Sequence, residues 1–415
     1  MIKRRNFLRL AAAGMAFPAF SNFGRSWQSV NIKDIVLTEE ALRIHWSAIV
    51  VDGHNDLPYK IRLKGPSALE TLDLMTYQPE FQTDIPRMLK GGVGAQFWMA
   101  VGWMGKQGNG RSGSSYCLEE IELIHKMTEK YSSVLEMAYS ADDIIRIRRQ
   151  GKIASLIGIE GGKAIENTLG VLDAYYRLGA RYMTLTLSDT IDWVDSATDV
   201  AKHGGITEFG EQVVLEMNRL GMLVDISHIS AEAMRDVLRV SQAPVIASHS
   251  SAFTLAPTPR NVPDDVLQSI AKNGGIVMVN FFPAYLTQEG AEISQHFWEY
   301  VHYLESDQSI SENEINKLED KWLEEHPVPK CSVEDVADHI EHIVKIAGID
   351  HVGLGSDFDG IPAGPDYLED VSCFPYITQV LLNRGYREEA IHKILGGNFL
   401  RVFQTVEGKA KKLYV

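Results

Sequence analysis

Residues 213–228 read VVLEMNRLGMLVDISH, and the order of residue types in this stretch decides the fold. The first half places apolar residues on one face of a helix, at Val213, Val214, Met217 and Leu220. Gly221 follows, and glycine is the residue that most often ends a helix. A mainly apolar run at 222–227 comes next, which is typical of a strand buried on both faces of a parallel sheet. The stretch therefore predicts a helix followed by a buried strand.

The same alternation of helical segments and apolar runs recurs along the whole chain. Eight runs have strand length: 48–53, 94–101, 153–159, 182–187, 222–227, 244–248, 275–281 and 351–356. Eight strands that alternate with helices predict a TIM-like (β/α)8 barrel that forms a single α/β domain. An open doubly wound sheet is the alternative that shares this pattern.

Composition and charge narrow the class of protein. The chain has 415 residues, of which 45% are apolar and 23% charged, which is the balance of a globular enzyme. A formal charge of −15 and the lack of a basic run in the body of the chain argue against nucleic-acid binding. Cys117, Cys331 and Cys373 are too few and too far apart for a disulfide scaffold or a cysteine-ligated zinc site.

The first residues resemble an export signal. Lys3, Arg4 and Arg5 precede a short apolar stretch rich in alanine at 10–17, which is the pattern of a twin-arginine signal. About 20 continuous apolar residues are needed to cross a bilayer, so we expect no stable membrane insertion. The prediction is a signal at 1–25 and export to the periplasm.

The remaining residues, 26–415, are expected to form the barrel domain. Two segments interrupt its alternation of strands and helices. The segment 102–116 is rich in glycine and serine and predicts a long loop, while 284–330 is a polar, helix-prone insertion. Because both follow predicted strands, we expect both on the rim of the barrel that carries function.

The candidate site residues lie where predicted strands end. His54 and Asp56 close the first run, and side chains two residues apart in an extended chain point to the same face. Four further residues each directly follow a run: Glu160, His228, His249 and Asp357. In a (β/α)8 barrel the C-terminal ends of the strands meet at one mouth, so we expect these side chains to converge.

Three imidazoles and three carboxylates at one mouth suit a divalent metal, above all zinc, and a carboxylate can bridge two ions. Manganese and cobalt accept the same ligands. Four other histidines do not end an apolar run and are expected to have ordinary structural roles: His203, His296, His302 and His326.

Several short motifs carry a resemblance to a known family. They are His54-Asn55-Asp56, Gly158-Ile159-Glu160-Gly161-Gly162, Asp225-Ile226-Ser227-His228, Ser248-His249-Ser250, Arg260-Asn261-Val262-Pro263-Asp264, Gly355-Ser356-Asp357-Phe358-Asp359-Gly360 and Asn398-Phe399-Leu400-Arg401-Val402-Phe403. In this order, over residues 40 to 406, the chain resembles the membrane (renal) dipeptidase family. The resemblance implies a TIM-like barrel of the metal-dependent amidohydrolase type.

The resemblance also implies a role for each site residue. His54 and Asp56 would hold a first zinc ion, His228 and His249 a second, and Glu160 would bridge the two and take part in catalysis. Asp357 would contact the substrate and act as the acid/base residue, and Arg260 would bind the free carboxylate of a dipeptide. The planar guanidinium of arginine suits a carboxylate.

These roles define a reaction. Two zinc ions about 3.5 to 4 Å apart can share a water, lower its pKa and present hydroxide to an amide carbonyl. Asp357 would take the proton from the water and deliver it to the leaving nitrogen. The expected activity is a zinc-dependent dipeptidase that acts on small dipeptides. A related amidohydrolase that acts on a cyclic amide, lactone or phosphoester is the alternative, and a homodimer is compatible with the sequence.

One position departs from the family pattern. Leu187 stands where the family usually has a histidine that helps to hold the substrate carbonyl and its developing oxyanion. Loss of one oxyanion donor costs on the order of 10² to 10³ in rate. Ser188, Asp189 or Asp192 could substitute, the metals could act alone, or the substrate could differ. A metal-binding family member with reduced activity is therefore a further alternative.

Overall fold

The computed structural model describes residues 34–65, 67–102, 112–307 and 309–413. The chain divides into a short unit, Met1–Ile35, and a large unit, Val36–Val415. The predicted export signal at 1–25 lies outside the described residues. The large unit carries the barrel and the candidate site.

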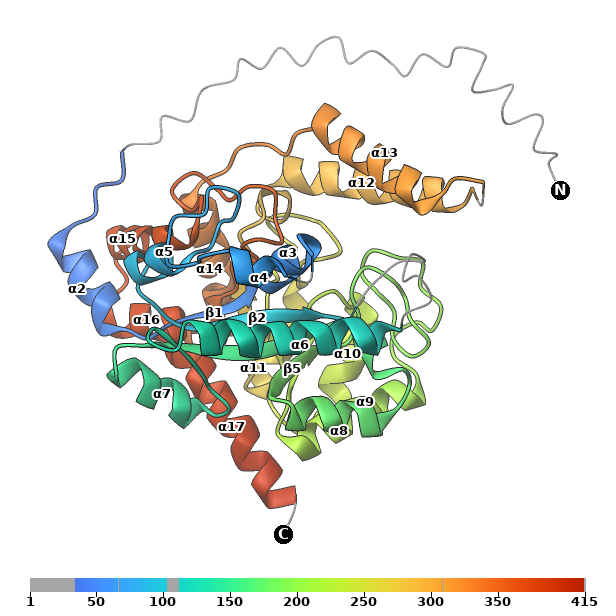
Figure 1. Ribbon diagram of the computed structural model, residues 1–415, viewed down its shortest axis with the longest axis horizontal. Coiled ribbons are helices and arrows are strands. Elements are labelled where there is room, and N and C mark those ends of the chain that lie inside the picture. The colour runs from blue at the N-terminus through green and yellow to red at the C-terminus, as the bar shows by residue number, and fades with distance from the viewer. Residues whose placement is uncertain (1–33, 66, 103–111, 308, 414–415) are drawn as a thin grey trace. The chain divides into compact units, whose positions relative to one another are not determined.

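Parallel strands form the centre of the large unit (Figure 1). Their bounds are β1 Val50–Asn55, β2 Val93–Val101, β3 Leu135–Met137, β4 Ile153–Glu160, β5 Ala180–Thr184, β6 Leu223–Asp225, β7 Ile246–Ala247, β8 Ile276–Val279 and β9 Val352–Leu354. Eight of them follow one another in the order β2-β1-β9-β8-β7-β6-β5-β4, and β4 pairs with β2 to close the ring. The predicted TIM-like barrel is thereby confirmed, and each of the eight predicted runs contains or overlaps one of these strands.

The strand β3 was not predicted and lies outside the ring. Its residues pair with Ile153, Ala154 and Ser155 at the beginning of β4. The strand β5 pairs with β4 only from Ile157 onward. β3 therefore lies beside β4 before β5 begins to pair with it, and adds no side chain to the C-terminal mouth of the barrel.

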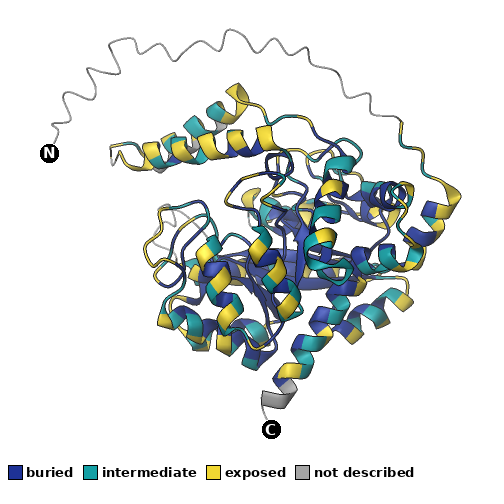
Figure 2. Ribbon diagram, turned by 180° about the vertical axis from the view of Figure 1, so that it is seen from behind, coloured by how far each residue is buried: buried dark blue, intermediate teal, exposed yellow. Residues whose placement is uncertain are grey.

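Helices surround the barrel, and the buried residues gather on the strands inside them (Figure 2). The helices are α2 Glu39–Ser47, α3 Leu57–Leu63, α4 Ala68–Thr71, α5 Ile85–Lys90, α6 Gly113–Lys130, α7 Ala141–Arg149, α8 Leu169–Arg177, α9 Glu208–Leu220, α10 Ala231–Val240, α11 Asp264–Asn273, α12 Gln288–Glu305, α13 Glu312–Glu325, α14 Val333–Ala347, α15 Phe374–Asn383, α16 Glu388–His392 and α17 Asn398–Leu413. None of the helices in the described part of the chain is long and apolar enough to cross a membrane.

The helix and the strand predicted within residues 213–228 both form, as α9 and β6. α9 begins after Thr207, whose side chain accepts a hydrogen bond from the backbone of Gly210. It ends at Gly221, which has the left-handed φ of 79° that glycine adopts at little cost. Val213, Val214 and Met217 are fully buried between the helix and the barrel wall, so the apolar face predicted from the sequence is the face that packs.

The predictions for the two interrupting segments, 102–116 and 284–330, have different outcomes. Residues 103–111 of the predicted loop lie outside the described residues, but α6 already begins at Gly113, so the loop predicted at 102–116 is too long at its C-terminal end. The insertion at 284–330 does form helices. α12 and α13 lie side by side as a hairpin, away from α17, at the opposite end of the barrel (Figure 1).

Candidate metal centre

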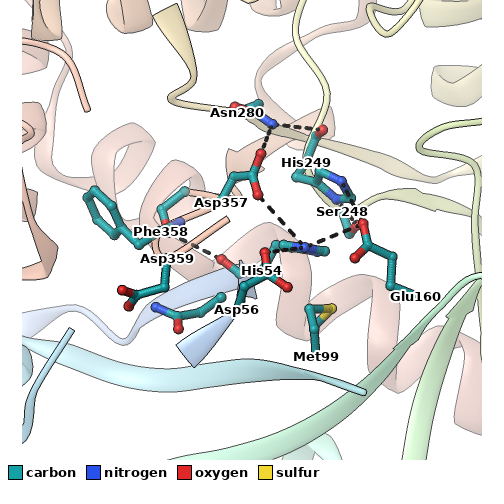
Figure 3. Close-up of polar contacts among 12 residues, drawn as sticks. His54, Asp56, Met99, Glu160, Ser248, His249, Asn280, Asp357, Phe358 and Asp359 are labelled. Carbon is teal, nitrogen blue, oxygen red and sulfur yellow. Dashed lines mark hydrogen bonds and ion pairs between the residues drawn. The ribbon is translucent and has the colours of Figure 1, made fainter. Parts of the chain in front are cut away.

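The barrel brings the predicted metal-site residues together. Figure 3 shows four of them: His54, Asp56, Glu160 and His249. His54 lies in β1 and Asp56 directly after it, while Glu160 ends β4. His228 follows β6, and His249 follows β7. Their convergence at one mouth follows from the parallel direction of the strands.

Glu160 occupies the middle of this group. Its Oε1 lies 3.0 Å from Nε2 of His228, 3.5 Å from Nε2 of His249 and 3.7 Å from Nε2 of His54. The Nε2 of His54 is also 3.3 Å from Oδ2 of Asp56. A single carboxylate oxygen thus faces three imidazole nitrogens, which groups these side chains as candidate metal ligands.

Asp357 borders the same group and is held by an amide. Its Oδ1 lies 3.9 Å from Nε2 of His54, and its Oδ2 accepts a hydrogen bond of 2.9 Å from Nδ2 of Asn280. Asn280 is itself oriented, because its Oδ1 accepts a bond of 2.6 Å from the backbone of Phe282. One oxygen of Asp357 is thus anchored while the other faces the metal residues.

The hydrogen bonds behind His54 fix its tautomer. The hydroxyl of Tyr182 donates to the carbonyl of Gly53 at 2.9 Å, so its oxygen is left to accept the proton on Nδ1 of His54 at 3.2 Å. The Nε2 of His54 is then the nitrogen that faces Asp56 and Glu160. This nitrogen is buried and has no hydrogen-bond partner among the described residues, which is the state of a ligand atom prepared for a metal.

A second set of hydrogen bonds fixes the tautomer and the orientation of His249. The hydroxyl of Ser248 donates to Oδ2 of Asp225 at 2.6 Å and accepts from Nδ1 of His249 at 2.7 Å. The other oxygen of Asp225 accepts from the backbone of Ser227 and of Ser248. The buried carboxylate therefore orients the histidine through the serine, with Nε2 turned toward Nε2 of His228, at 2.8 Å, and toward Glu160.

Asp52 plays a comparable structural part at the other side of the mouth. Its two oxygens accept bonds from the backbone and hydroxyl of Ser356, at 2.7 and 2.6 Å, and from Gln96 at 2.9 Å. Ser356 immediately precedes Asp357. The carboxylate of Asp52 thus ties the segment after β9 to the middle of β1 and fixes the position of the residue that precedes Asp357.

Two of the site residues have backbone conformations that are rare for residues other than glycine. His228 has a φ of 68° and Asp357 a φ of 65°. Such residues cost of order 1–3 kcal/mol each and persist where the surrounding structure enforces them. Here the carbonyl of His228 accepts a bond of 2.7 Å from Ala197, and the amide of Asp357 donates one of 3.2 Å to His54. The strain turns both side chains into the mouth.

The buried carboxylates of the site favour a positive charge beside them. Burial raises the pKa of Glu160 to about 8 and that of Asp357 to about 6. Burial alone would lower the pKa of His54, but Glu160 and Asp56 raise it to about 10. Carboxylates this deeply buried need cations near them. This donor set of imidazole and carboxylate fits divalent metal ions of the zinc type.

Arg260 lies at the edge of the same site. It is 2% exposed, and its guanidinium carbon lies 5.3 Å from the centre of the Tyr285 ring. Its contacts to the hydroxyl of Ser250 and the carbonyl of His249 are both long, at 3.4 Å, and its Nε has no partner among the described residues. A buried guanidinium with weak partners is prepared for an anionic ligand.

A cavity of about 760 Å³ contains the candidate site. Asp56, Glu160, His228, His249, Asp357 and Arg260 all line it, and so do Leu187 and Ser188. Asp189 and Asp192 line a separate cavity of about 680 Å³. Of the three substitutes predicted for the missing histidine, Ser188 alone therefore borders the metal site.

The four histidines set aside in the sequence lie elsewhere, as expected. His296 and His326 are exposed, His203 bonds the backbone of Ile191, and His302 faces Asp199 in the separate cavity. The sequence did not single out the residues that orient the ligands: Asp52, Tyr182, Asp225, Ser248 and Asn280. A signal existed for Asp52 and Asp225, because a carboxylate inside an apolar strand must have buried partners.

Comparisons with known proteins identify the family of the chain. The profile of the family described as Membrane dipeptidase (Peptidase family M19) matches residues 38–414. The chain is 37% identical over 400 residues to Dipeptidase tcpJ of Claviceps purpurea (strain 20.1), covering 95% of this chain and 83% of that protein. It is 38% identical over 380 residues to human Dipeptidase 3, covering 90% and 68%.

Solved structures share the fold. The probable dipeptidase PvdM from Pseudomonas aeruginosa has a TM-score of 0.77 at 24% identity, over 89% of this chain and 98% of that one. A metallo peptidase from Rhodobacter sphaeroides, solved with a phosphinate mimic of the dipeptide L-Ala-D-Ala, has a TM-score of 0.71 at 24% identity, over 86% and 99%. The family profile and the curated relatives show that this chain belongs to the membrane dipeptidase family and is a metallopeptidase of family M19.

Proposed function

We propose that this chain is a two-zinc dipeptidase that hydrolyses the single amide bond of small dipeptides. The observation that carries the proposal is the position of Glu160, whose Oε1 faces the Nε2 atoms of His54, His228 and His249 within 3.0 to 3.7 Å. In this assignment His54 and Asp56 would hold one zinc ion, His228 and His249 would hold the other, and Glu160 would be shared between them. Bound zinc supplies Lewis acidity, which polarises the scissile carbonyl and lowers the pKa of a water.

Asp357 is the acid/base residue of the proposal. The bond from Asn280 holds one of its oxygens, so the other can accept a proton from water and pass it to the leaving nitrogen. Burial raises the pKa of Asp357 to about 6, which brings the group closer to the pH at which it must both accept and release a proton. No other carboxylate of the described cavity has such an anchor together with an oxygen turned to the metal residues.

Arg260 sets the length of the substrate. Its guanidinium lines the cavity beside His249, and a carboxylate bound to it would lie within one residue of an amide at the metal residues. A longer peptide would have to place an uncharged amide against this buried guanidinium, which leaves charge-assisted hydrogen bonds unmade. The proposal therefore predicts an exopeptidase that accepts dipeptides and rejects tripeptides.

The test is a substrate panel with defined metal content. The protein is stripped of metal with a chelator and loaded with zinc, manganese or cobalt. Release of free amino acids is followed for dipeptides, tripeptides and dipeptide amides, and hydrolysis of a cyclic amide, a lactone and a phosphoester is measured alongside. We expect efficient cleavage of dipeptides, slow cleavage of dipeptide amides and no cleavage of tripeptides, with zinc sufficient. Cleavage of a cyclic amide, lactone or phosphoester in place of every dipeptide would transfer the assignment to a related amidohydrolase. Binding of two zinc ions without any turnover would favour the alternative of a metal-binding family member with reduced activity. Leu187, which replaces the family histidine, is the reason to test this alternative.

We also propose that residues 1–25 direct export by the twin-arginine route, because Arg4 and Arg5 precede a short apolar stretch at 10–17. Replacing both arginines by lysine should keep the protein in the cytoplasm of a bacterial host. Fractionation of periplasm and cytoplasm measures this, and unchanged export of the variant would contradict the proposal.

A further inference from the structure

The cavity at the metal centre has a second wall that the proposed chemistry does not use. Besides the metal residues, it is lined by Ile293, Phe297 and Trp298 of α12, by Leu323 of α13 and by the prolines at 327 and 329. All of these belong to the insertion and not to the barrel. The α12–α13 hairpin thus contributes an apolar face to the cavity that holds the metal residues.

Sequence spacing explains why this face is apolar. Ile293 and Phe297 are four residues apart and so share one side of α12, and Trp298, the next residue, borders that side about 100° further round the helix. The opposite side of the helix is polar or exposed: Tyr303, for example, is 62% exposed and does not line the cavity. The apolar residues of α12 are therefore directed to the cavity by the helix itself.

Contacts between the two helices hold the face in place. The ring of Phe297 lies 5.5 Å from that of Trp322 on α13, and Trp322 stacks on His326 at 4.2 Å. Such aromatic pairs contribute stability beyond their buried area and restrict ring rotation. Phe297 is thus supported from behind by α13.

The rings are nevertheless incompletely covered. Phe297 and Trp298 are only half-buried, and Leu323 is 38% exposed, although all three border the cavity. Apolar surface that faces a concave site beside reactive groups is the usual mark of a ligand subsite. Ile361 and Pro362, four and five residues after Asp357, line the same cavity and connect this face to the acid/base residue.

We propose that Phe297, Trp298 and Leu323 form a subsite for a bulky apolar side chain, so that this chain selects dipeptides that contain an aromatic or large aliphatic residue. The inference rests on the proposed dipeptidase function. A dipeptide of two small residues would leave much of the 760 Å³ empty, and the rings of the hairpin would stay in contact with water. A phenyl or isobutyl group would cover them.

The kinetic test uses the zinc-loaded full chain with Ala-Ala, Phe-Ala and Ala-Phe. Burial of one phenyl group corresponds to a preference of roughly 10- to 100-fold in kcat/KM over Ala-Ala for at least one of the two phenylalanine dipeptides. The variant Trp298→Ala should reduce that ratio to within a few-fold, while Tyr303→Ala, on the outer side of the same helix, should leave it unchanged. The position of the preferred phenylalanine shows which residue of the substrate enters the subsite.

Two further measurements keep the inference separate from the catalytic assignment. Leu323→Ala removes a side chain that is already partly exposed, so it tests the subsite in a hairpin whose folding, checked by circular dichroism, should be intact. Calorimetry with phosphinate mimics of Ala-Ala and of the phenylalanine dipeptides reports binding preference without turnover. Absence of any hydrolysis would refute the dipeptidase proposal alone. Equal kcat/KM and equal Kd for the small and large compounds, or ratios unchanged in both Trp298→Ala and Leu323→Ala, would overturn the subsite.

Discussion

The variant Ser248→Ala tests whether a residue that is not itself a metal ligand orients one, His249. The hydroxyl of Ser248 lies between Oδ2 of Asp225, at 2.6 Å, and Nδ1 of His249, at 2.7 Å. Without it, Nδ1 of His249 loses the acceptor that fixes its tautomer and ring orientation. Asp225 loses one of its buried hydrogen-bond donors.

The expected magnitude follows from these two bonds. Loss of a partner behind a ligating histidine lowers metal affinity by roughly 10- to 100-fold, which corresponds to about 1.4 to 2.8 kcal/mol. The assay is competition for zinc against a chromophoric chelator at fixed pH. The hydroxyl of Ser248 bonds to Asp225 and His249 and not to Glu160 or His228. The loss of zinc affinity should therefore affect one of the two zinc-binding steps and not the other.

Ser155 offers a matched control. It is a buried serine on β4 of the same barrel, and its hydroxyl has no hydrogen-bond partner among the described residues. Ser155→Ala should therefore bind zinc as the unmodified chain does. If Ser248→Ala and Ser155→Ala were equal in zinc affinity, the argument that Asp225 orients His249 would be refuted.

Three other perturbations have defined outcomes. Arg260→Met should lower kcat/KM for dipeptides by roughly 10²-fold and change hydrolysis of dipeptide amides little, since it removes charged hydrogen bonds to a carboxylate; equal losses for both substrates would argue against the carboxylate role. Leu187→His should raise kcat for dipeptides by up to about 10²-fold if the cavity lacks an oxyanion donor, and an unchanged kcat would mean that Ser188 or the metals already suffice. His339 accepts a bond from Ala252 and donates one to Leu286, so it is bound in its neutral form, and burial lowers its pKa to about 4. Its contribution to stability is complete above pH 6.5 and is lost as the pH falls from 6.5 to about 4, by up to about 3 kcal/mol. Denaturant unfolding of metal-free protein at pH 7.5 and 4.5 should show a smaller difference for His339→Gln than for the unmodified chain, and an equal difference would contradict this reading.

Much of the fold was readable from the sequence because the strands of a barrel are buried on both faces. Runs such as 153–159 and 275–281 contain few polar residues, and glycines such as Gly221 and Gly274 end the helices between them with left-handed φ values. β3 was missed because it has three residues with Glu136 at its centre, so it shows no apolar run.

The convergence of the metal residues could be predicted for the same reason. His54, Glu160, His228 and His249 each end or follow a strand, and parallel strands bring their ends to one mouth. What lay beyond the sequence was the set of contacts between segments distant in the chain. Nothing in the residues near His54 indicates that Tyr182, 128 positions away, orients its ring.

The insertion at 284–330 also depends on contacts between distant segments, which the sequence does not reveal. Its polar composition predicted helices, and α12 and α13 are helices. Its position over the metal residues depends on packing between Phe297 and Trp322, and on the return of the chain through 327–329 to the barrel. Helical periodicity gives which side of α12 is apolar but not what that side will face.

The central claim is that five side chains, His54, Asp56, Glu160, His228 and His249, hold two metal ions. Anomalous diffraction from crystals of the zinc-loaded protein tests it most directly. The account predicts two peaks about 3.5 to 4 Å apart, each about 2.0 to 2.2 Å from its imidazole or carboxylate ligands, with Glu160 in contact with both. A single peak, or two peaks that Glu160 does not join, would contradict it.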